Sequence, residues 1–401
     1  MHTCTCDCVS AANWFPQLVD HTNPNRGTFA QRWYWDHSAW DGTANSPVLF
    51  YICGEAPCTG SPSGSVINLA QQTKSLIVAL EHRWYGESLP GDITSTRDLM
   101  TLDVDQVMED IPAFISYIEG LLGGVDRKWV AIGGSYPGAL SAWIREKRPD
   151  VIDASWSSSG VVNAVYKFTR FDQLVAQAVG TECANSIRAV TAAMEAAWPN
   201  PTARAAMLAL FGTPADFTQQ DFAWMLADSA AMGYVAPPRR ACARNRRRVG
   251  TRLPVFFHFV TCTRTCPLAS AHICVRNTLY VCVCVRARVC VCARACSAQY
   301  GFKDEMCSYL VPQPANVLAA FANWTNTHYG ATFGASCYYS TACLSDPKRV
   351  AEWYDAKTWV WQCCYQLVRG ALLARCSTPR RGGSALLPLP LPQRACNALA
   401  A

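Results

Sequence analysis

A serine in a glycine-rich turn is the side chain of this sequence best placed to do chemistry. The short apolar run Trp129–Ile132 predicts a strand, and Ala139–Lys147 predicts a helix. Ser135 stands between them, within the sequence Gly-Gly-Ser-Tyr-Pro-Gly. A serine hydroxyl needs a base and exposure on a tight turn to act as a nucleophile, and strand, serine among small residues, then helix is typical of that turn. We therefore predict that Ser135 is a catalytic nucleophile.

The motif alone leaves a second interpretation open, a tight turn that holds a serine by chance. The generic pattern places glycine two residues after the serine, whereas Pro137 stands there and Gly138 follows one position later. The preceding residues favour the catalytic interpretation, because Gly133 and Gly134 allow the backbone to bend sharply. Pro137 also fits a first helical turn, which makes no use of the N–H that proline lacks.

The segments around the serine predict the elements that position it. Two short apolar runs, Val48–Ile52 and Leu76–Leu80, predict buried strands. Apolar residues between Val104 and Ile118 recur at helical spacing, and Asp153–Trp156 is a candidate for a further strand. Strands that alternate with helices favour a mostly parallel sheet with helices on both faces. Ala-rich helical stretches between 166 and 232 then predict a helical insertion.

The segment 233–298 differs in composition from the rest of the chain. It holds twelve Arg, nine of the 22 Cys and no Lys, Asp or Glu, and without it the chain has 23 basic against 29 acidic residues. The alternation of Val and Cys could form a half-buried strand, but it lacks the C-x₂-C spacing of a zinc site. We interpret the block as translated non-coding sequence and expect it to be loosely structured. We predict no nucleic-acid partner, because the arginines do not share a helix face.

A series of motifs in the chain is more specific than the turn alone. The motifs stand in the order Trp14–His21, Phe29–Tyr34, Gly54-Glu55, Glu81–Pro90, Gly133–Gly138 and Ser157–Ser159. Together they resemble the serine peptidase family of lysosomal Pro-X carboxypeptidase, dipeptidyl peptidase II and the thymus-specific serine protease. The resemblance covers residues 14–232 and 299–365, and the blocks EHRWYGESLP and GGSYPG are specific in combination.

This resemblance implies an α/β-hydrolase core with a mostly parallel sheet and a helical insertion domain, and cleavage of peptides next to proline through an acyl-enzyme. Ser135 matches the family's nucleophile, and the backbone N–H of Tyr136 is then the first candidate oxyanion donor. The turn at Gly54 and Glu55 matches the family's Gly-Gly-Glu-Gly, which is placed to supply the second donor. Cys53 replaces the first glycine of that motif.

On this basis we divide the chain into six segments. They are an unassigned start (1–13), the N-terminal part of the α/β-hydrolase core (14–165), the first part of the helical insertion (166–232), the Arg- and Cys-rich block (233–298), the second part of the insertion (299–365) and a low-complexity tail (366–401). In a family member Met232 and Gln299 would abut, so the block splits one motif.

Three charged residues, Glu81, His82 and Arg83, directly follow the predicted strand Leu76–Leu80. We favour a structural role for them, in which a buried charged cluster fixes the following loop, over direct catalysis. The reason is chain order, because His82 precedes Ser135 whereas α/β-hydrolases carry serine, acid and histidine in that order.

The catalytic Asp and His have no match in this sequence. The family places them near the C-terminus, in segments resembling N-G-x-x-D-P-W and H-C-x-D, and the histidines after Ser135 (His258, His272 and His328) stand in no such motif. Trp359–Cys363 looks like the start of the family's W-x-x-Q-T-C-T-E-F-G, after which the resemblance stops. We therefore expect the C-terminal part of the core to be missing and the chain to be nearly inactive. A peptide-binding pseudoenzyme and an α/β-hydrolase esterase stay open as alternatives.

Other features bear on where the complete protein works and what it binds. Asn323-Trp324-Thr325 is an acceptor pattern for N-glycosylation. Five cysteines in family-like sequence suit disulfides of an oxidising compartment: Cys183, Cys307, Cys337, Cys343 and Cys363. We expect a lysosomal, vacuolar or secreted protein, although no signal peptide is visible. We also expect peptide substrates with proline near the cleaved end, no metal, no cofactor and no membrane span, and we leave a homodimer open.

Overall fold

The computed structural model describes residues 11–62, 64–164, 169–232, 303–329, 337–350, 354–363 and 365, with the backbone of three strands between 272 and 294. The chain divides into two compact units, Met1–Phe168 with Thr341–Ala401 and Thr169–Ser340. Residues 341–365 thus group with the first unit, whereas the sequence predicts them in the helical insertion. The reason is packing, because Trp361 shares a buried cluster with Trp84 and Tyr85.

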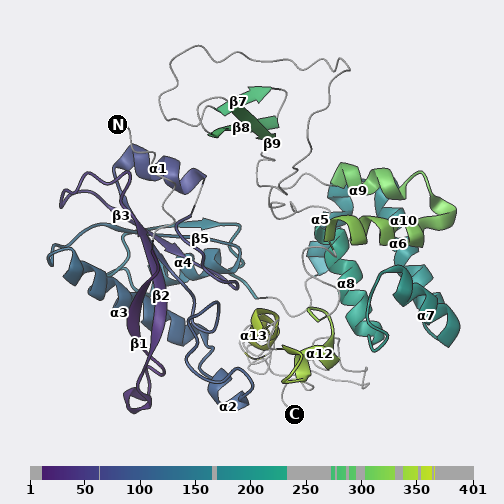
Figure 1. The fold of residues 1–401 in the computed structure, drawn as a ribbon, viewed down its shortest axis with the longest axis horizontal. Helices are drawn as coiled ribbons and strands as arrows, with labels where there is room; N and C mark the ends of the chain where they lie inside the picture. Colours follow the sequence, from purple (N-terminus) through teal and green to yellow (C-terminus); the bar gives the residue numbers. More distant parts are fainter. Residues whose placement is uncertain are drawn as a thin grey trace, which may run out of the picture. The chain divides into compact units, whose positions relative to one another are not determined.

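The first unit is built on a six-stranded sheet of order β1-β2-β4-β3-β5-β6 (Figure 1). Its strands are β1 (Asn13–Leu18), β2 (Thr28–Asp36), β3 (Val48–Ile52), β4 (Leu76–Leu80), β5 (Trp129–Gly134) and β6 (Ala154–Ser158). β2 pairs antiparallel with β1 and β4, whereas β4, β3, β5 and β6 run parallel. The carboxyl ends of these four strands meet at one edge, and the predicted mostly parallel α/β sheet is confirmed.

Alternating side chains explain why helices cover both faces of this sheet. Phe50 of β3 belongs to a buried cluster with α3 (Val104–Leu121) and α4 (Tyr136–Lys147). The neighbouring Leu49 points to the other face and belongs to a cluster with α1 (Ser65–Thr73). Successive strand residues face opposite sides, so one apolar strand serves two helical layers. The remaining short elements of this unit are η1 (Pro24–Arg26), α2 (Thr96–Leu99), α12 (Thr341–Ser345) and α13 (Tyr354–Gln362).

Strand β6 forms the outer edge of the sheet beyond β5. Its first four residues are exposed, and Trp156 among them is 38% exposed. Parallel strands in α/β proteins are normally buried on both faces. This side of the core is therefore open within the part of the chain that the structure describes.

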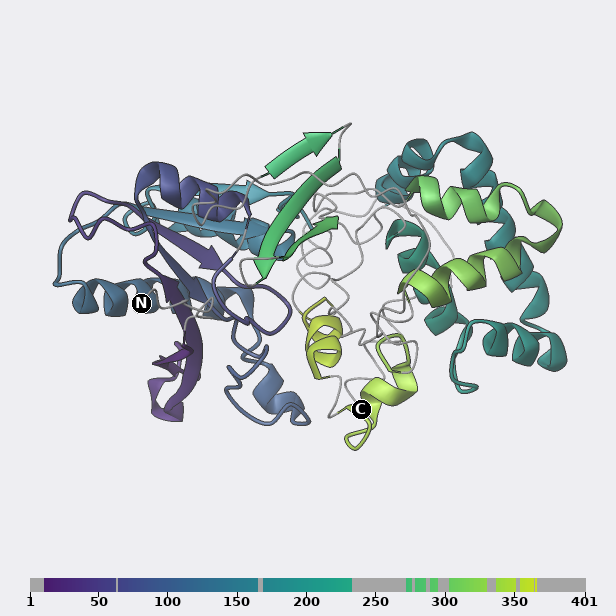
Figure 2. The same ribbon diagram turned by 45° about the horizontal axis from the view of Figure 1, so that its top comes forward.

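The second unit is helical, and its helices are the teal and green ones in Figure 2. They are α5 (Thr169–Val179), α6 (Thr181–Ala197), α7 (Pro201–Leu210), α8 (Gln219–Met232), α9 (Lys303–Leu310) and α10 (Val317–Trp324), with the short turns η2 (Pro314–Asn316) and η3 (Thr325–Tyr329). One buried cluster includes Met194, Phe222 and Phe321 from three of them. A disulfide between Cys183 and Cys307 joins α6 to α9 across 124 residues.

The Arg- and Cys-rich block contains three strands, β7 (His272–Val275), β8 (Thr278–Val285) and β9 (Val289–Arg294). They pair antiparallel in the order β7-β8-β9. Alternating Val and Cys favour extended backbone that can pair, which agrees with the strand that the sequence leaves open for this stretch. The expectation of a loosely structured block stays a prediction. The rest of the block lies outside the described residues.

Two searches of the described residues bear on membrane and metal binding. No described helix is both long and apolar enough to cross a bilayer. Within the same residues, no three His, Cys, Asp or Glu side chains gather where they could hold a metal ion.

Candidate active site

Ser135 lies in the turn where β5 ends and α4 begins. It is exposed, and its backbone has φ of 59° and ψ of −123°. Positive φ is uncommon for a residue with a side chain and costs on the order of 1–3 kcal/mol. Such strain is typical of functional positions, because the rest of the fold must impose it.

Glycines let the turn pack tightly enough to hold this conformation. A Cβ on Gly133 would lie 2.1 Å from the carbonyl oxygen of Pro137, and one on Gly138 would lie 2.8 Å from that of Ser158. Both contacts are with backbone atoms, which cannot move aside easily. The sequence around Ser135 therefore fits the turn sterically as well as by pattern.

The two predicted oxyanion donors come from loops that touch each other. Tyr136 is the first residue of α4, so its N–H has no acceptor within the helix and the positive end of the helix dipole lies there. The Gly54–Glu55 turn follows β3, which pairs directly with β5. A Cβ on Gly54 would lie 2.6 Å from Cγ of Pro137, so this turn lies against the start of α4.

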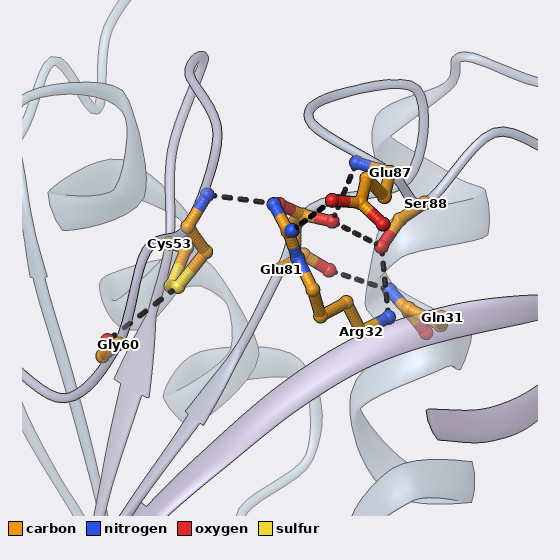
Figure 3. Close-up of a disulfide and its surroundings, with 8 residues drawn as sticks. Gln31, Arg32, Cys53, Gly60, Glu81, Glu87 and Ser88 are labelled. Atoms are coloured by element: carbon orange, nitrogen blue, oxygen red, sulfur yellow. Dashed lines mark hydrogen bonds and ion pairs between the residues drawn. A yellow bond between two sulfur atoms is a disulfide. The ribbon is translucent and has the colours of Figure 1, made fainter. Parts of the chain in front are cut away.

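A disulfide closes the loop that contains Gly54 and Glu55. It joins Cys53 to Cys58, five residues apart (Figure 3). At the level of sequence, Cys53 stands out only as a replacement of the family's glycine. The two cysteines on either side of the loop could have predicted the disulfide. Burial raises the pKa of the Glu55 carboxyl inside this loop.

Glu81 anchors the disulfide loop and the loop after β4. Its fully buried carboxylate accepts bonds from Nε of Arg32 (3.2 Å), the N–H of Cys58 (2.8 Å), the N–H of Glu87 (3.0 Å) and Oγ of Ser88 (2.6 Å). Figure 3 shows Arg32, Glu87 and Ser88 converging on this carboxylate beside the disulfide. The contacts fit the predicted structural role of Glu81.

His82 has both ring nitrogens engaged. Its Nδ1 lies 2.6 Å from the carbonyl oxygen of Arg83, and its Nε2 lies 3.0 Å from the hydroxyl of Tyr136. Burial lowers its pKa to about 4, so the ring is neutral near pH 7. A neutral imidazole has one N–H and one acceptor nitrogen, and both are in use here. These contacts are consistent with the structural role that the sequence predicts for His82.

Arg83 makes a buried ion pair that lies apart from the serine turn. Its Nε donates to Oδ2 of Asp110 on α3 at 2.6 Å, and its Nη1 donates to the carbonyl oxygens of Val19 (3.1 Å) and Thr101 (3.2 Å). The guanidinium is fully buried, and these acceptors compensate its charge. Arg83 thus ties the β1–β2 hairpin to α3.

No histidine side chain described in the first unit is free to activate Ser135. His21 contacts Oδ1 of Asp110 at 2.7 Å, and His82 is engaged as above. His37 follows β2, whose end pairs with the start of β4, so it lies at the opposite sheet edge from Ser135. The side chains of His258, His272 and His328 lie outside the described residues.

Helix α13 contributes residues that the sequence does not single out. Gln362 donates to the hydroxyl of Tyr136 and accepts from the hydroxyl of Tyr85. The motif Trp359–Cys363 pointed to this helix but gave no role to its glutamine. Cys363, predicted to join a disulfide, is a free thiol, and burial raises its pKa to about 12.

Comparisons with known proteins agree with these features. Residues 17–233 match the family model of serine carboxypeptidase S28. The probable serine protease EDA2 of Arabidopsis thaliana is 34% identical over 230 residues, which cover 55% of this chain and 46% of that protein. The thymus-specific serine protease of Mus musculus is 33% identical (43% and 34% covered), and the lysosomal Pro-X carboxypeptidase of Pongo abelii is 35% identical (37% and 31% covered). The chain spans less than half the length of these curated relatives.

Proposed function

Because the chain belongs to the serine carboxypeptidase S28 family, we propose that Ser135 is the nucleophile of a serine peptidase that works through an acyl-enzyme. The observation that carries this proposal is the strained backbone of Ser135, with φ of 59°, in an exposed turn between β5 and α4. A tight turn that held a serine by chance would have no need of that strain.

The proposed chemistry assigns a task to each loop. Oγ of Ser135 attacks the carbonyl carbon of the scissile bond while a general base takes its proton. The carbonyl oxygen becomes an oxyanion, which accepts bonds from the N–H of Tyr136 and from an N–H of the Gly54–Glu55 turn. The C–N bond then breaks, the amine leaves with the proton, and water hydrolyses the ester on Ser135.

The general base and its acid are proposed to come from sequence that this chain lacks. Two observations support this. The described histidines of the first unit are engaged or lie at the far sheet edge, and strand β6 exposes residues that a further part of the core would cover. A serine without its base keeps only part of its rate, because losing triad members costs on the order of 10⁴–10⁶ in turnover. The chain as given should therefore be nearly inactive.

The proposed substrates are peptides with proline next to the cleaved bond. The support is the resemblance of the EHRWYGESLP and GGSYPG blocks and the Pro-X carboxypeptidase among the relatives. An esterase would share the serine turn, so peptide and ester substrates of matched sequence distinguish the two activities.

The test compares two proteins, the 401-residue chain and the same chain extended with the C-terminal segment of a family member. Both are treated with a fluorophosphonate reagent and assayed on prolyl peptides. The extended protein should cleave the peptides and lose activity in Ser135→Ala, whereas Ser65→Ala, an exposed serine on α1, should keep it. Strong Ser135-dependent turnover by the 401-residue chain would reveal a base that we have not identified.

A peptide-binding pseudoenzyme is the second candidate, and the engagement of His21 and His82 favours it. It predicts saturable binding of prolyl peptides without turnover in either protein. We also propose that the complete protein works in a lysosome, a vacuole or outside the cell, which the disulfide Cys183–Cys307 supports. Mass spectrometry of native protein should then find Asn323 glycosylated.

A further inference from the structure

We propose that Gln362 of α13 is a positioning residue for the oxyanion site and that it acts through the hydroxyl of Tyr136. The consequence for chemistry rests on the proposed role of Ser135. The positioning itself rests on geometry alone and can be tested without any turnover.

Four side chains form one continuous chain of hydrogen bonds behind the serine turn. The hydroxyl of Tyr85 donates to Oε1 of Gln362 at 2.9 Å, and Nε2 of Gln362 donates to the hydroxyl of Tyr136. That hydroxyl contacts Nε2 of His82 at 3.0 Å, and Nδ1 of His82 contacts the carbonyl oxygen of Arg83 at 2.6 Å. This series of hydrogen bonds connects α13 to the loop after β4 through Tyr136, the residue that follows Ser135.

The direction of every bond in this chain follows from its far end. The carbonyl oxygen of Arg83 can only accept, so Nδ1 of His82 carries a proton. The buried ring is neutral near pH 7, so its Nε2 is an acceptor. Tyr136 must then donate its own proton to His82, which leaves its oxygen free to accept from Gln362. The amide of Gln362 therefore presents its NH₂ group to Tyr136 and its oxygen to Tyr85. No other arrangement satisfies all four side chains.

Burial makes this arrangement costly to disturb. Gln362, Tyr136 and Tyr85 are fully buried, and His82 is 3% exposed. A polar group left unpaired in such surroundings loses its full hydration, so each member holds the next in place. Ring contacts add to the restraint, because Trp359 of α13 lies 5.9 Å from the ring of Tyr136, centroid to centroid.

This restraint reaches the backbone because a tyrosine side chain is stiff. Its phenol ring has two rotatable bonds between the hydroxyl and Cα, so fixing the hydroxyl and the ring limits how the peptide at Tyr136 can turn. The N–H of that peptide is a proposed oxyanion donor, and donors of this kind work only when they are held in advance in the right direction. Gln362 lies 226 residues downstream of Tyr136, so sequence distance conceals the connection.

The first test measures the position of the amide of residue 136 by NMR, on protein labelled with ¹⁵N-tyrosine or, in the variants that carry Tyr136→Phe, with ¹⁵N-phenylalanine. Gln362→Met and Tyr136→Phe each remove one member, and both should shift the amide resonance of residue 136. The double variant should shift it no further than Tyr136→Phe alone, because Gln362 acts only through the hydroxyl. Val360→Ala is the matched control, since it creates a cavity at the same helix and removes none of the hydrogen-bonded side chains. It should leave the amide resonance in place.

The same proteins labelled with ¹⁵N-histidine report the state of the His82 ring. His82 should be the Nδ1–H tautomer and should stay neutral between pH 5 and 8. Asp110 and Arg83 are the charged groups that act on this ring. The ion pair with Arg83 lowers the pKa of the Asp110 carboxyl, which therefore stays charged in that range. A His82 ring protonated at Nε2, or one that titrates near its ordinary value, would overturn the inference.

The second test measures the rate at which a fluorophosphonate labels Ser135 in the protein extended with the C-terminal segment of a family member. Gln362→Met and Tyr136→Phe should slow labelling by about 10-fold to 100-fold, without additivity in the double variant, while Val360→Ala labels normally. Additive losses, or equal losses in Val360→Ala, would refute the positioning role. If the extended protein resists labelling while the NMR cycle behaves as expected, the proposed function fails and the positioning of Tyr136 stands.

Discussion

The two loops that meet at Ser135 are held by different kinds of interaction. Tyr136 is held by neutral hydrogen bonds to the buried side chains of His82 and Gln362. The Gly54–Glu55 turn is fixed by a covalent bridge and by the carboxylate of Glu81. Neutral bonds are insensitive to redox conditions and salt, whereas a disulfide responds to reductants and a buried carboxylate to the loss of its partners. The two proposed oxyanion donors should therefore lose their positions under different conditions.

The largest effect should come from removing the anchor of the Gly54–Glu55 side. Glu81→Ala leaves the guanidinium of Arg32 buried without its main partner, which costs about 3–5 kcal/mol of unfolding free energy. Glu87 is the other partner of Arg32, and the Glu87 side chain is 64% exposed. Glu87→Ala should therefore cost less than about 1 kcal/mol of unfolding free energy. Urea unfolding of both variants, followed by tryptophan fluorescence, gives the comparison. Equal losses would show that Glu81 is not the anchor.

Comparing Gly86 with Gly27 measures how tightly the Glu81 carboxylate packs against the loop that it anchors. Gly86 has φ of +58°, and a Cβ there would lie 1.9 Å from Oε1 of Glu81, whereas Gly27 has φ of +82° with no atom within 4 Å. Gly27→Ala should cost about 1 kcal/mol from backbone strain alone. Gly86→Ala adds a clash with the carboxylate and should cost about 2–4 kcal/mol. If the two variants unfold alike, the Glu81 carboxylate moves freely and the anchor is weaker than proposed.

These residues also mark what the sequence could and could not predict. The strands β3 to β6, the helices α3 and α4 and the serine turn follow from apolar periodicity and glycine placement, which are local. The strands β1 and β2 were not predicted. The family motif led to Ser135, Gly54 and the cluster at Glu81. The role of Gln362 could not be predicted, because its partner is 226 residues away and the bond exists only in the folded chain. The strands β7, β8 and β9 match the period of two that the sequence offers as an alternative, although its composition favours translated non-coding sequence.

Opening the disulfide should loosen one loop and leave the other unchanged. Chain-entropy arguments give about 2 kcal/mol for a loop as short as Cys53–Cys58. The double variant Cys53→Ser with Cys58→Ser should exchange amide hydrogens faster in residues 53–58 and at the unmodified rate in residues 133–138. Hydrogen exchange with mass spectrometry reads both segments in one sample. Faster exchange in both segments would mean that the supports of the two loops are coupled. Free thiols at Cys53 and Cys58 in the native chain would show that the disulfide does not form.

The smallest effect is expected at Asp355, through which helix α13 contacts the loop that Glu81 anchors. Oδ1 of Asp355, in α13, accepts a 3.4 Å bond from the N–H of Gly86, which packs on Glu81. Burial raises the pKa of Asp355 to about 6 from 3.8, so the folded chain binds this proton more tightly than the unfolded chain. Below about pH 4 both states are protonated and the group costs nothing. The loss of unfolding free energy caused by the buried carboxylate grows as the pH rises from about 4 to about 6 and is constant above that.

Asp355→Asn should remove that cost and keep the acceptor for the N–H of Gly86. Because the carboxyl is partly exposed, solvent screening reduces the gain to about 1 kcal/mol at pH 8. Urea unfolding at several pH values should show the variant more stable than the unmodified chain at pH 8 and equal to it near pH 4. The gain should vanish in Gly86→Ala, if the clash with Glu81 displaces the backbone that Asp355 contacts. A variant that is less stable at pH 8 would mean that the carboxylate charge is stabilising there, which would make Asp355 part of the Glu81 anchor.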